Sequence, residues 1–240
     1  TLWGLFAAVL SGLCDYGVLP IENSTAGSVK QVYDLLIANN CYIVRAARIK
    51  INHALLACPG ATVDSIREIY SHEQALSQCQ SHLEQLPNAM LHACSNTAAA
   101  AQMVAEMGRT DVAALASYHC AELYGLRCLI PDMQDNDNNH TRFICIAPRP
   151  EIYPGTNKTT LMLTVPHRPG ALYKVLARLY CLGLNVQKLE SRPIPNRDFE
   201  FLFYFDIESS IYSTDFERMI SELEEVCEEV HYLGSYLEIV

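Results

Sequence analysis

Short apolar runs typical of β-strands alternate with longer runs of helical periodicity from residue 15 to about residue 147. The first strand-like run reads DYGVLPIE, and the helical segment after it places Val29, Val32 and Leu36 on one face. The same order returns at AMLHAC, expected to be a buried strand, and at DVAALAS. Alternation of this kind is typical of a domain with helices on both faces of a sheet. The sequence therefore predicts an α/β fold.

A change of composition marks a second part of the chain. Residues 148–158, PRPEIYPGTNK, are rich in Pro, Gly and Asn and predict a linker. The periodicity after it predicts strand, helix, two strands, helix with Thr214 as its cap, and a final strand VHYLGSYLEI. This βαββαβ order is that of the ferredoxin-like unit. We therefore predict a first domain at 1–148, a linker at 149–158 and a second domain at 159–240.

Composition and charge argue against several classes of function. The formal charge of the 240 residues is −10, which disfavours a nucleic-acid partner. No apolar run approaches the length of a membrane span, so we expect no membrane association. The ten cysteines form no C-x-x-C pair and mostly lie in apolar runs. They predict buried thiols in a reducing compartment, the cytoplasm, and no zinc site.

The first residues, TLWGLFAAVLSGLCDYG, have apolar side chains at helical spacing, at Leu5, Val9 and Leu13. They carry no basic leader, which favours an amphipathic helix over a signal peptide. The chain begins at Thr1 rather than Met, and we expect that a preceding segment has been removed.

Polar residues cluster where predicted strands meet the following helices. The first cluster lies in YGVLPIENSTAGSV, where a helix is expected to begin near Ser28; the others are Ser71-His72, Ser95-Asn96-Thr97 and Ser117. Helix N-termini favour anions, and strand ends of an α/β sheet share one crevice in which ligands bind. Ser, Thr and Asn are also ordinary N-cap residues, and Ser71 with Gln74 fits a capping box. Each cluster alone fits a cap or an anion site.

Two further segments carry candidate binding residues. In NDNNHTRFICIA, Arg142 at a strand end could bind a carboxylate bidentately or pair with a surface acid. His72 and His140 are expected to be solvated or capping residues. In HRPGALYKVL, Gly170 permits close approach of a ligand or neighbouring chain, or simply forms a turn. No order typical of a catalytic triad, zinc protease or phosphate loop is present.

Together, in this order and spacing, five segments resemble the prephenate dehydratase family with a C-terminal ACT domain. They are YGVLPIENSTAGSV, YSHEQALSQC, NNHTRF, RPGALYKVL and LESRP, and the resemblance covers nearly the whole chain. It implies a two-lobed, periplasmic-binding-protein-like catalytic domain and a regulatory ACT domain. It also implies conversion of prephenate to phenylpyruvate without cofactor or metal, with L-phenylalanine as the allosteric ligand at an interface of a homodimer or homotetramer.

The resemblance also implies roles for particular residues. Thr141, at the departing hydroxyl, and Arg142, on a carboxylate, are the implied catalytic residues. The implied substrate-binding residues are Asn23, Ser24, Ser71, His72, Asn96, Thr97 and Phe143. The implied phenylalanine-binding residues are Gly170, Ala171, Leu172, Asn185, Glu190, Ser191 and Arg192.

The chain departs from the family at its start. The glycine-rich turn G-P-x-G-T/S-[FY]-S that opens the catalytic domain in the family is missing, so we expect the first strand of that domain to be absent. A chorismate mutase domain could precede it. Two alternative functions stay open: arogenate dehydratase, whose substrate differs only by an amino group in place of a keto group, and a non-catalytic amino-acid-sensing binding protein.

Overall fold

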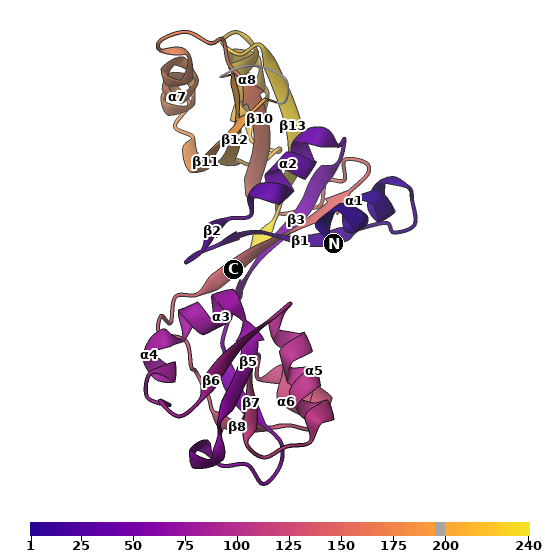
Figure 1. The fold of residues 1–240 in the computed structure, drawn as a ribbon. Coiled ribbons are helices and arrows are strands. Elements are labelled where there is room, and N and C mark those ends of the chain that lie inside the picture. Colours follow the sequence, from indigo (N-terminus) through magenta and orange to yellow (C-terminus); the bar gives the residue numbers. More distant parts are fainter. Residues whose placement is uncertain (195–199) are drawn as a thin grey trace. The chain divides into compact units, whose positions relative to one another are not determined.

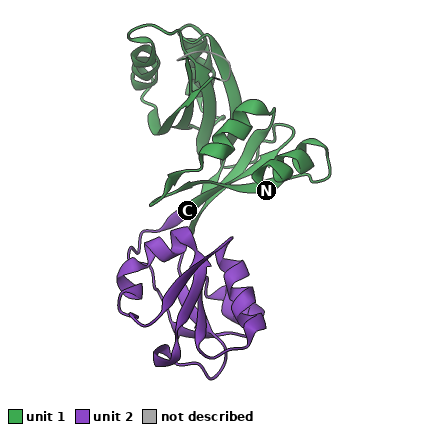
Figure 2. Ribbon diagram, viewed as in Figure 1, with its two compact units in different colours: residues 1–49, 141–240 green, residues 50–140 purple. Residues whose placement is uncertain are grey.

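The computed structural model describes residues 1–194 and 200–240 (Figure 1). Contacts divide the chain into two compact units (Figure 2). Unit 1 comprises residues 1–49 and 141–240, and unit 2 comprises residues 50–140. Contacts thus group the predicted second domain with the first 49 residues instead of dividing the chain at the linker. Within the described residues, no helix is both long enough and apolar enough to cross a membrane.

Unit 1 contains a five-stranded sheet in the order β14-β3-β9-β1-β2. Its elements are α1 (Leu2–Leu10), β1 (Gly17–Asn23), β2 (Gly27–Ser28), α2 (Lys30–Ala38), β3 (Tyr42–Lys50), β9 (His140–Ala147) and β14 (Glu238–Ile239). Leu19 and Ile21 of β1 and Ile144 of β9 form its apolar core with Phe6 of α1 and Leu36 of α2. The expected N-terminal helix is present, but it ends at Leu10, so Leu13 lies outside it and is exposed.

Unit 1 also contains a βαββαβ module, residues 158–236. Its elements are β10 (Lys158–Thr164), α7 (Ala171–Cys181), β11 (Asn185–Pro193), β12 (Phe201–Glu208), α8 (Thr214–Glu224) and β13 (Glu229–Tyr236). The strands form an antiparallel sheet in the order β11-β12-β10-β13, which confirms the predicted element order. The cap of α8 is Ser213, whose hydroxyl accepts from the N–H of Asp215, and not Thr214 as predicted.

Both faces of the module sheet are covered. One face packs under α7 and α8 through Leu161, Leu163 and Phe205. The other face places Met162 and Tyr204 in the same apolar cluster as the residues of the five-stranded sheet. This is why every residue of β10 is buried. The module and the five-stranded sheet therefore share one core.

The predicted final strand is in fact two strands in two sheets. β13 belongs to the module, whereas β14 pairs in parallel with β3, with Glu238 opposite Ala46. At Gly234 a bulge in β13 brings the backbone close to Ile43, and the backbone φ is 148°. The sequence between the two strands contains no turn signal, so the change of sheet is not visible in it.

Unit 2 is an α/β layer structure with the strand order β6-β5-β7-β4-β8. Its elements are β4 (Ala54–Ala57), η1 (Val63–Ser65), β5 (Glu68–His72), α3 (Glu73–Gln78), α4 (Gln80–Leu83), β6 (Met90–Cys94), α5 (Thr97–Met107), β7 (Val112–Ala116), α6 (His119–Tyr124) and β8 (Arg127–Ile130). Two separate apolar clusters pack against the strands of this sheet. One contains residues of α5 and α6, and the other contains residues of α3 and α4. The predicted α/β fold with helices on both faces is therefore confirmed here.

Two expectations for unit 2 are corrected. AMLHAC was expected to be a buried strand, but β6 is an edge strand, and Met90 and Leu91 are exposed. The capping box at Ser71 and Gln74 predicted a helix start, and the structure has two short helices here, because the backbone leaves the helical conformation at Cys79. β8 was not predicted at all, because its four residues are too short a run to show alternation.

Candidate functional site

The polar run after β1 forms a hairpin turn and does not cap a helix. The Asn23 side-chain oxygen accepts hydrogen bonds from the N–H of Thr25 at 3.0 Å and of Ala26 at 2.9 Å. This turn returns the chain as β2, with Gly27 opposite Asn23. The helix expected near Ser28 begins only at Lys30, and no side chain among the described residues caps it. Asn23 is thus a turn residue whose amide orientation is fixed by two backbone donors.

The structure brings Asn23 and Thr141 together within unit 1. β1 and β9 are antiparallel, and Asn23 lies directly opposite Thr141. The Asn23 Nδ2 group donates to Thr141 Oγ1 at 3.0 Å. Because the hydroxyl oxygen is the acceptor in this bond, the hydroxyl hydrogen is left to donate elsewhere. The pair therefore presents a neutral O–H donor whose oxygen Asn23 holds in place.

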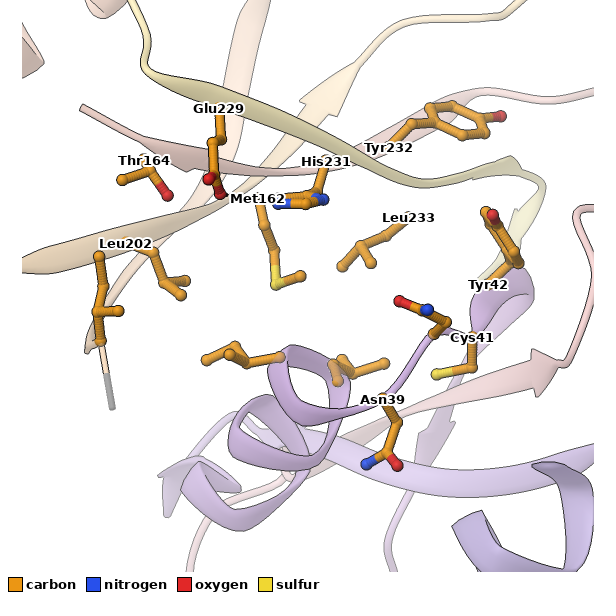
Figure 3. A pocket seen from close by; sticks show the side chains of 14 residues that line it. Asn39, Cys41, Tyr42, Met162, Thr164, Leu202, Glu229, His231, Tyr232 and Leu233 are labelled. Carbon is orange, nitrogen blue, oxygen red and sulfur yellow. Dashed lines mark hydrogen bonds and ion pairs between the residues drawn. The ribbon is translucent and has the colours of Figure 1, made fainter. Parts of the chain in front are cut away.

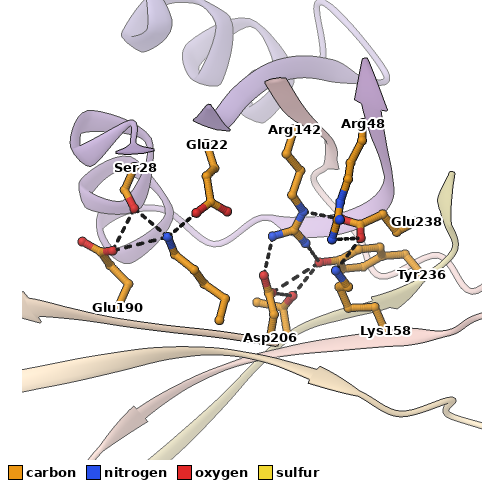
Figure 4. A network of polar contacts seen from close by, with 11 residues as sticks. Glu22, Ser28, Arg48, Arg142, Lys158, Glu190, Asp206, Tyr236 and Glu238 are labelled. Atoms are coloured by element: carbon orange, nitrogen blue, oxygen red, sulfur yellow. Dashed lines mark hydrogen bonds and ion pairs between the residues drawn. The ribbon is translucent and has the colours of Figure 1, made fainter. Parts of the chain in front are cut away.

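Arg142 is not placed to bind a substrate carboxylate, and this prediction is corrected. Its guanidinium is buried and its Nη1 donates to Asp206 (Figure 4). Its Nη2 donates to the Tyr236 hydroxyl at 2.9 Å, and its Nε forms an ion pair with Glu238. Burial alone would lower the pKa of Arg142, but its charge interactions, with Tyr236 first and then Asp206, raise it. The alternative, a surface acid, is wrong as well: Arg142 pairs with acids, but Asp206 and Glu238 are buried.

In unit 2, the polar residues at the ends of β5 and β6 have different roles. The two strands are parallel, so α3 and α5 begin at the same edge of the sheet. His72 caps α3 through Nδ1, which accepts from the Gln74 N–H at 3.2 Å. Asn96 caps α5, since its side-chain oxygen accepts from the Ala99 N–H at 2.7 Å. Thr97 is the first residue of that helix.

Ser71 does not have the predicted role. Its side chain is fully buried, and its hydroxyl donates to the Leu115 carbonyl of the neighbouring strand at 2.5 Å. It therefore neither caps α3 nor offers a proton to a ligand. Ser117 does not cap α6 through its side chain either; its backbone carbonyl accepts from the Cys120 N–H.

A buried polar cluster in unit 2 was missed by the sequence analysis. Gln78 Oε1 accepts from Asn139 Nδ2 at 3.0 Å and lies 3.3 Å from His53 Nε2. The His53 N–H donates to Gln134 Oε1 at 2.9 Å. Burial lowers the pKa of His53 despite its contact with Gln78. Asn139 lies two residues before Thr141, so this cluster holds the chain that enters β9. Of the residues in this cluster, the sequence analysis had singled out only the segment that contains Asn139, as a candidate binding segment.

The family model of prephenate dehydratase matches residues 1–151. The chain belongs to the prephenate dehydratase family. It is 38% identical over 243 residues to arogenate dehydratase/prephenate dehydratase 2 of Arabidopsis thaliana. That match covers 96% of this chain and 63% of the relative, so the chain spans less than two thirds of its relative's length.

Solved structures of two other proteins have the same fold as this family member. One is prephenate dehydratase of Arthrobacter aurescens in complex with L-Phe, at 30% identity and a TM-score of 0.85, covering 96% of this chain and 77% of that one. The other is GqqA, described as a novel type of quorum quenching acylase, at 34% identity and a TM-score of 0.89, covering 99% and 87%.

The module of this prephenate dehydratase family member has a pocket beside α7. Its volume is about 360 Å³. The lining residues are Val165, Pro166, His167, Arg168, Pro169, Ala171, Leu172, Glu200, Phe201 and Phe203. Gly170 precedes α7 with a φ of 81°, a conformation that favours glycine. Two of the predicted phenylalanine-binding residues, Ala171 and Leu172, thus line one pocket.

The other predicted phenylalanine-binding residues lie elsewhere in the chain. Arg192 makes a bidentate ion pair with Asp34 of α2, and Glu190 accepts from the Ser28 hydroxyl. The assignment of Glu190 and Arg192 to the ligand is therefore corrected, because unit 1 itself occupies their side chains. Ser191 is exposed on β11, and Asn185 donates to Glu208 at 3.1 Å.

A second pocket of unit 1 has a volume of about 270 Å³ (Figure 3). It lies between the end of α2 and the module sheet, and Met162, Leu202 and Leu233 form part of its apolar wall. Glu229 and His231 add polar groups. Among the described lining residues there is no predicted site residue, so the pocket does not belong to the candidate site.

Proposed function

We propose that this protein catalyses the decarboxylative dehydration of prephenate to phenylpyruvate, as a lyase of phenylalanine biosynthesis. The observation that carries the proposal is the Asn23–Thr141 pair, with the Thr141 hydroxyl as its donor, in a member of the prephenate dehydratase family. The reaction removes the ring carboxylate as carbon dioxide and the ring hydroxyl as hydroxide, which takes a proton from the solvent to become water. The aromatic ring that forms supplies the driving force.

In the proposed mechanism, Thr141 donates a hydrogen bond to the departing hydroxyl. A neutral alcohol is a weak acid, so Thr141 acts as a donor in the transition state and not as a full proton source. Asn23 holds the Thr141 oxygen by donating to it. We propose Ser24, His72, Asn96, Thr97 and Phe143 as the remaining substrate-binding residues. Asn96 and Thr97 begin an 11-residue helix whose N-terminus favours a carboxylate.

The test is a pair of substitutions at Thr141, followed by the absorbance of phenylpyruvate. Thr141→Val keeps the shape but removes the hydroxyl, and kcat should fall by about 10²–10⁴-fold. Thr141→Ser keeps the hydroxyl and should retain most of the rate. Calorimetry should show that both variants still bind prephenate. If the kcat of Thr141→Val equals that of the unchanged protein, the proposed role of Thr141 is wrong.

The comparisons favour a second candidate substrate and a second reaction class. The Arabidopsis relative is named for both arogenate and prephenate. Measuring kcat/KM for both substrates with the same preparation decides between them. The similarity to GqqA adds acylase activity as a further candidate, and an N-acyl amide substrate tests it. Binding of substrate without any turnover would favour the non-catalytic sensor.

We further propose that residues 159–240 form an ACT regulatory domain, joined by a linker at 149–158 to a catalytic domain at 1–148. The βαββαβ order and the pocket beside α7 support this proposal. L-Phenylalanine would bind there between two copies of the chain in a homodimer or homotetramer, with Gly170, Ala171, Leu172, Asn185 and Ser191 as contacts. The cytoplasm remains the proposed location, on the cysteine pattern.

A further inference from the structure

Two pairs of charged residues face each other between the five-stranded sheet and the module (Figure 4). In the five-stranded sheet, Glu22 of β1 lies opposite Arg142 of β9. In the module sheet, Lys188 of β11 lies opposite Asp206 of β12. Lys188 Nζ contacts Glu22 Oε1 at 2.6 Å, and Arg142 pairs with Asp206. The acid of each cross-strand pair thus contacts the cation of the pair in the other sheet.

The Glu22–Arg142 pair is the immediate neighbour of the candidate catalytic pair. Asn23 and Thr141 are the next opposed residues along the same two strands. Successive side chains of a strand point to opposite faces of the sheet. Glu22 and Arg142 therefore point to one face of the sheet, where the module contacts them. Asn23 and Thr141, the adjacent residues, point to the other face.

The module side of this contact is fixed by its own hydrogen bonds. Asp206 is fully buried, and its second oxygen accepts from the Thr160 hydroxyl at 2.6 Å. The Tyr236 hydroxyl, which accepts from Arg142, lies 2.7 Å from the same Thr160 oxygen. Lys188 also contacts Ser28 Oγ at 2.8 Å, so it reaches both strands of the hairpin. A displacement of Arg142 would separate it from the buried Asp206, and a displacement of Lys188 would separate it from Glu22.

We propose that Lys188 and Asp206 are positioning residues for the reaction: they hold Glu22 and Arg142 and thereby fix the Asn23–Thr141 pair. The kinetic part of this inference rests on the proposed function. A donor that must meet a departing group tolerates little displacement, and a shift of about 1 Å can cost about 10²-fold in rate. The substrate contacts themselves lie on other residues, so substrate binding should change little.

The experiment compares Lys188→Met and Asp206→Asn with the unchanged protein. For both variants we expect kcat to fall by about 10–10²-fold while KM stays within about threefold. Hydrogen exchange should become faster in peptides that cover β1–β2 and the start of β9, and should stay unchanged in β7 of unit 2. Lys174→Met, an exposed substitution on α7 of the same module, is the matched control and should change neither readout.

The outcomes separate this inference from the proposed function. If Lys188→Met folds and neither its kcat nor its hydrogen exchange changes, the positioning role is wrong. A rise in KM with kcat unchanged would also contradict it. If the unchanged protein turns over neither prephenate nor arogenate, the proposed function and the kinetic part of this inference fail. Faster exchange in β1–β2 and β9 would then still support the structural part, in which Lys188 and Asp206 fix the Asn23–Thr141 pair. Lys188 is partly exposed, so this variant decides the question if Asp206→Asn does not fold.

Discussion

The side chain of His53 makes the stability of unit 2 depend on pH. It is 6% exposed, and burial lowers its pKa. The unfolded chain therefore binds a proton near the ordinary histidine pKa of about 6.5, where the folded chain does not. Stability contributed in this way is fully present above about pH 6.5 and is lost as the pH falls towards the lowered pKa.

We therefore expect the free energy of unfolding to decrease between pH 7 and pH 5, by at most about 1.4 kcal/mol per pH unit from this group. In His53→Gln the decrease should be smaller. Urea denaturation at several pH values measures it. His119→Gln, at an exposed position of the same unit, should keep the pH dependence of the unchanged protein. Equal slopes for His53→Gln and the unchanged protein would contradict this account.

Single residues show where sequence patterns suffice and where they fail. The Asn23 and Thr141 candidates came from short motifs, and the structure places them together because β1 and β9 pair. Arg142 was wrongly assigned to a ligand because its actual partners, Asp206 and Glu238, are distant in sequence and lie in other strands. An isolated sequence shows a charge but not the buried acid that neutralises it.

At the scale of elements, the bulge at Gly234 lets β13 approach β3. A Cβ atom on Gly234 would lie 2.1 Å from the Ile43 carbonyl oxygen, and its φ of 148° also favours glycine. Gly234→Ala should therefore lower the free energy of unfolding by more than the about 1–3 kcal/mol of backbone strain alone.

The matched control for Gly234→Ala is Gly155→Ala. Gly155 also has a positive φ, 83°, but no atom of the described residues outside its chain neighbours lies within 4 Å of its Cβ position. It should show the cost of the backbone conformation without the clash. Urea denaturation of both variants gives the difference, and equal losses would mean that β13 does not need this close approach.

Elements with clear periodicity were predicted, and those without it were not. The βαββαβ order follows from alternating and helical apolar patterns, and the structure confirms it. β8 was missed because a run of four residues carries no period, and β14, only two residues long, was predicted as part of the same strand as β13. The hairpin after β1 was assigned as a helix start because Asn and Ser are suited to both turns and caps.

At the scale of the whole molecule, the residues proposed to bind L-phenylalanine lie in two separate places of one chain. Phe201, which lines the pocket beside α7, lies at one end of β12, and Asn185 pairs with Glu208 at the other. Positions 201 and 208 are seven residues apart, which is about 23 Å at 3.3 Å per residue. One amino acid cannot span that distance. A ligand that contacts both the pocket and Asn185 must therefore lie between two copies.

Mixed dimers test this arrangement. Leu172→Ala should weaken the pocket, Asn185→Ala should remove the polar contact, and neither variant alone should bind L-phenylalanine in calorimetry. A dimer with one chain of each kind, purified through two different tags, combines both defects in one site and leaves the other site intact. It should therefore bind about one L-phenylalanine per dimer, where the unchanged protein binds about two. If each site belonged to a single chain, every site of the mixed dimer would carry one defect. No binding by the mixed dimer, with the unchanged dimer binding normally, would therefore refute a ligand held between two chains.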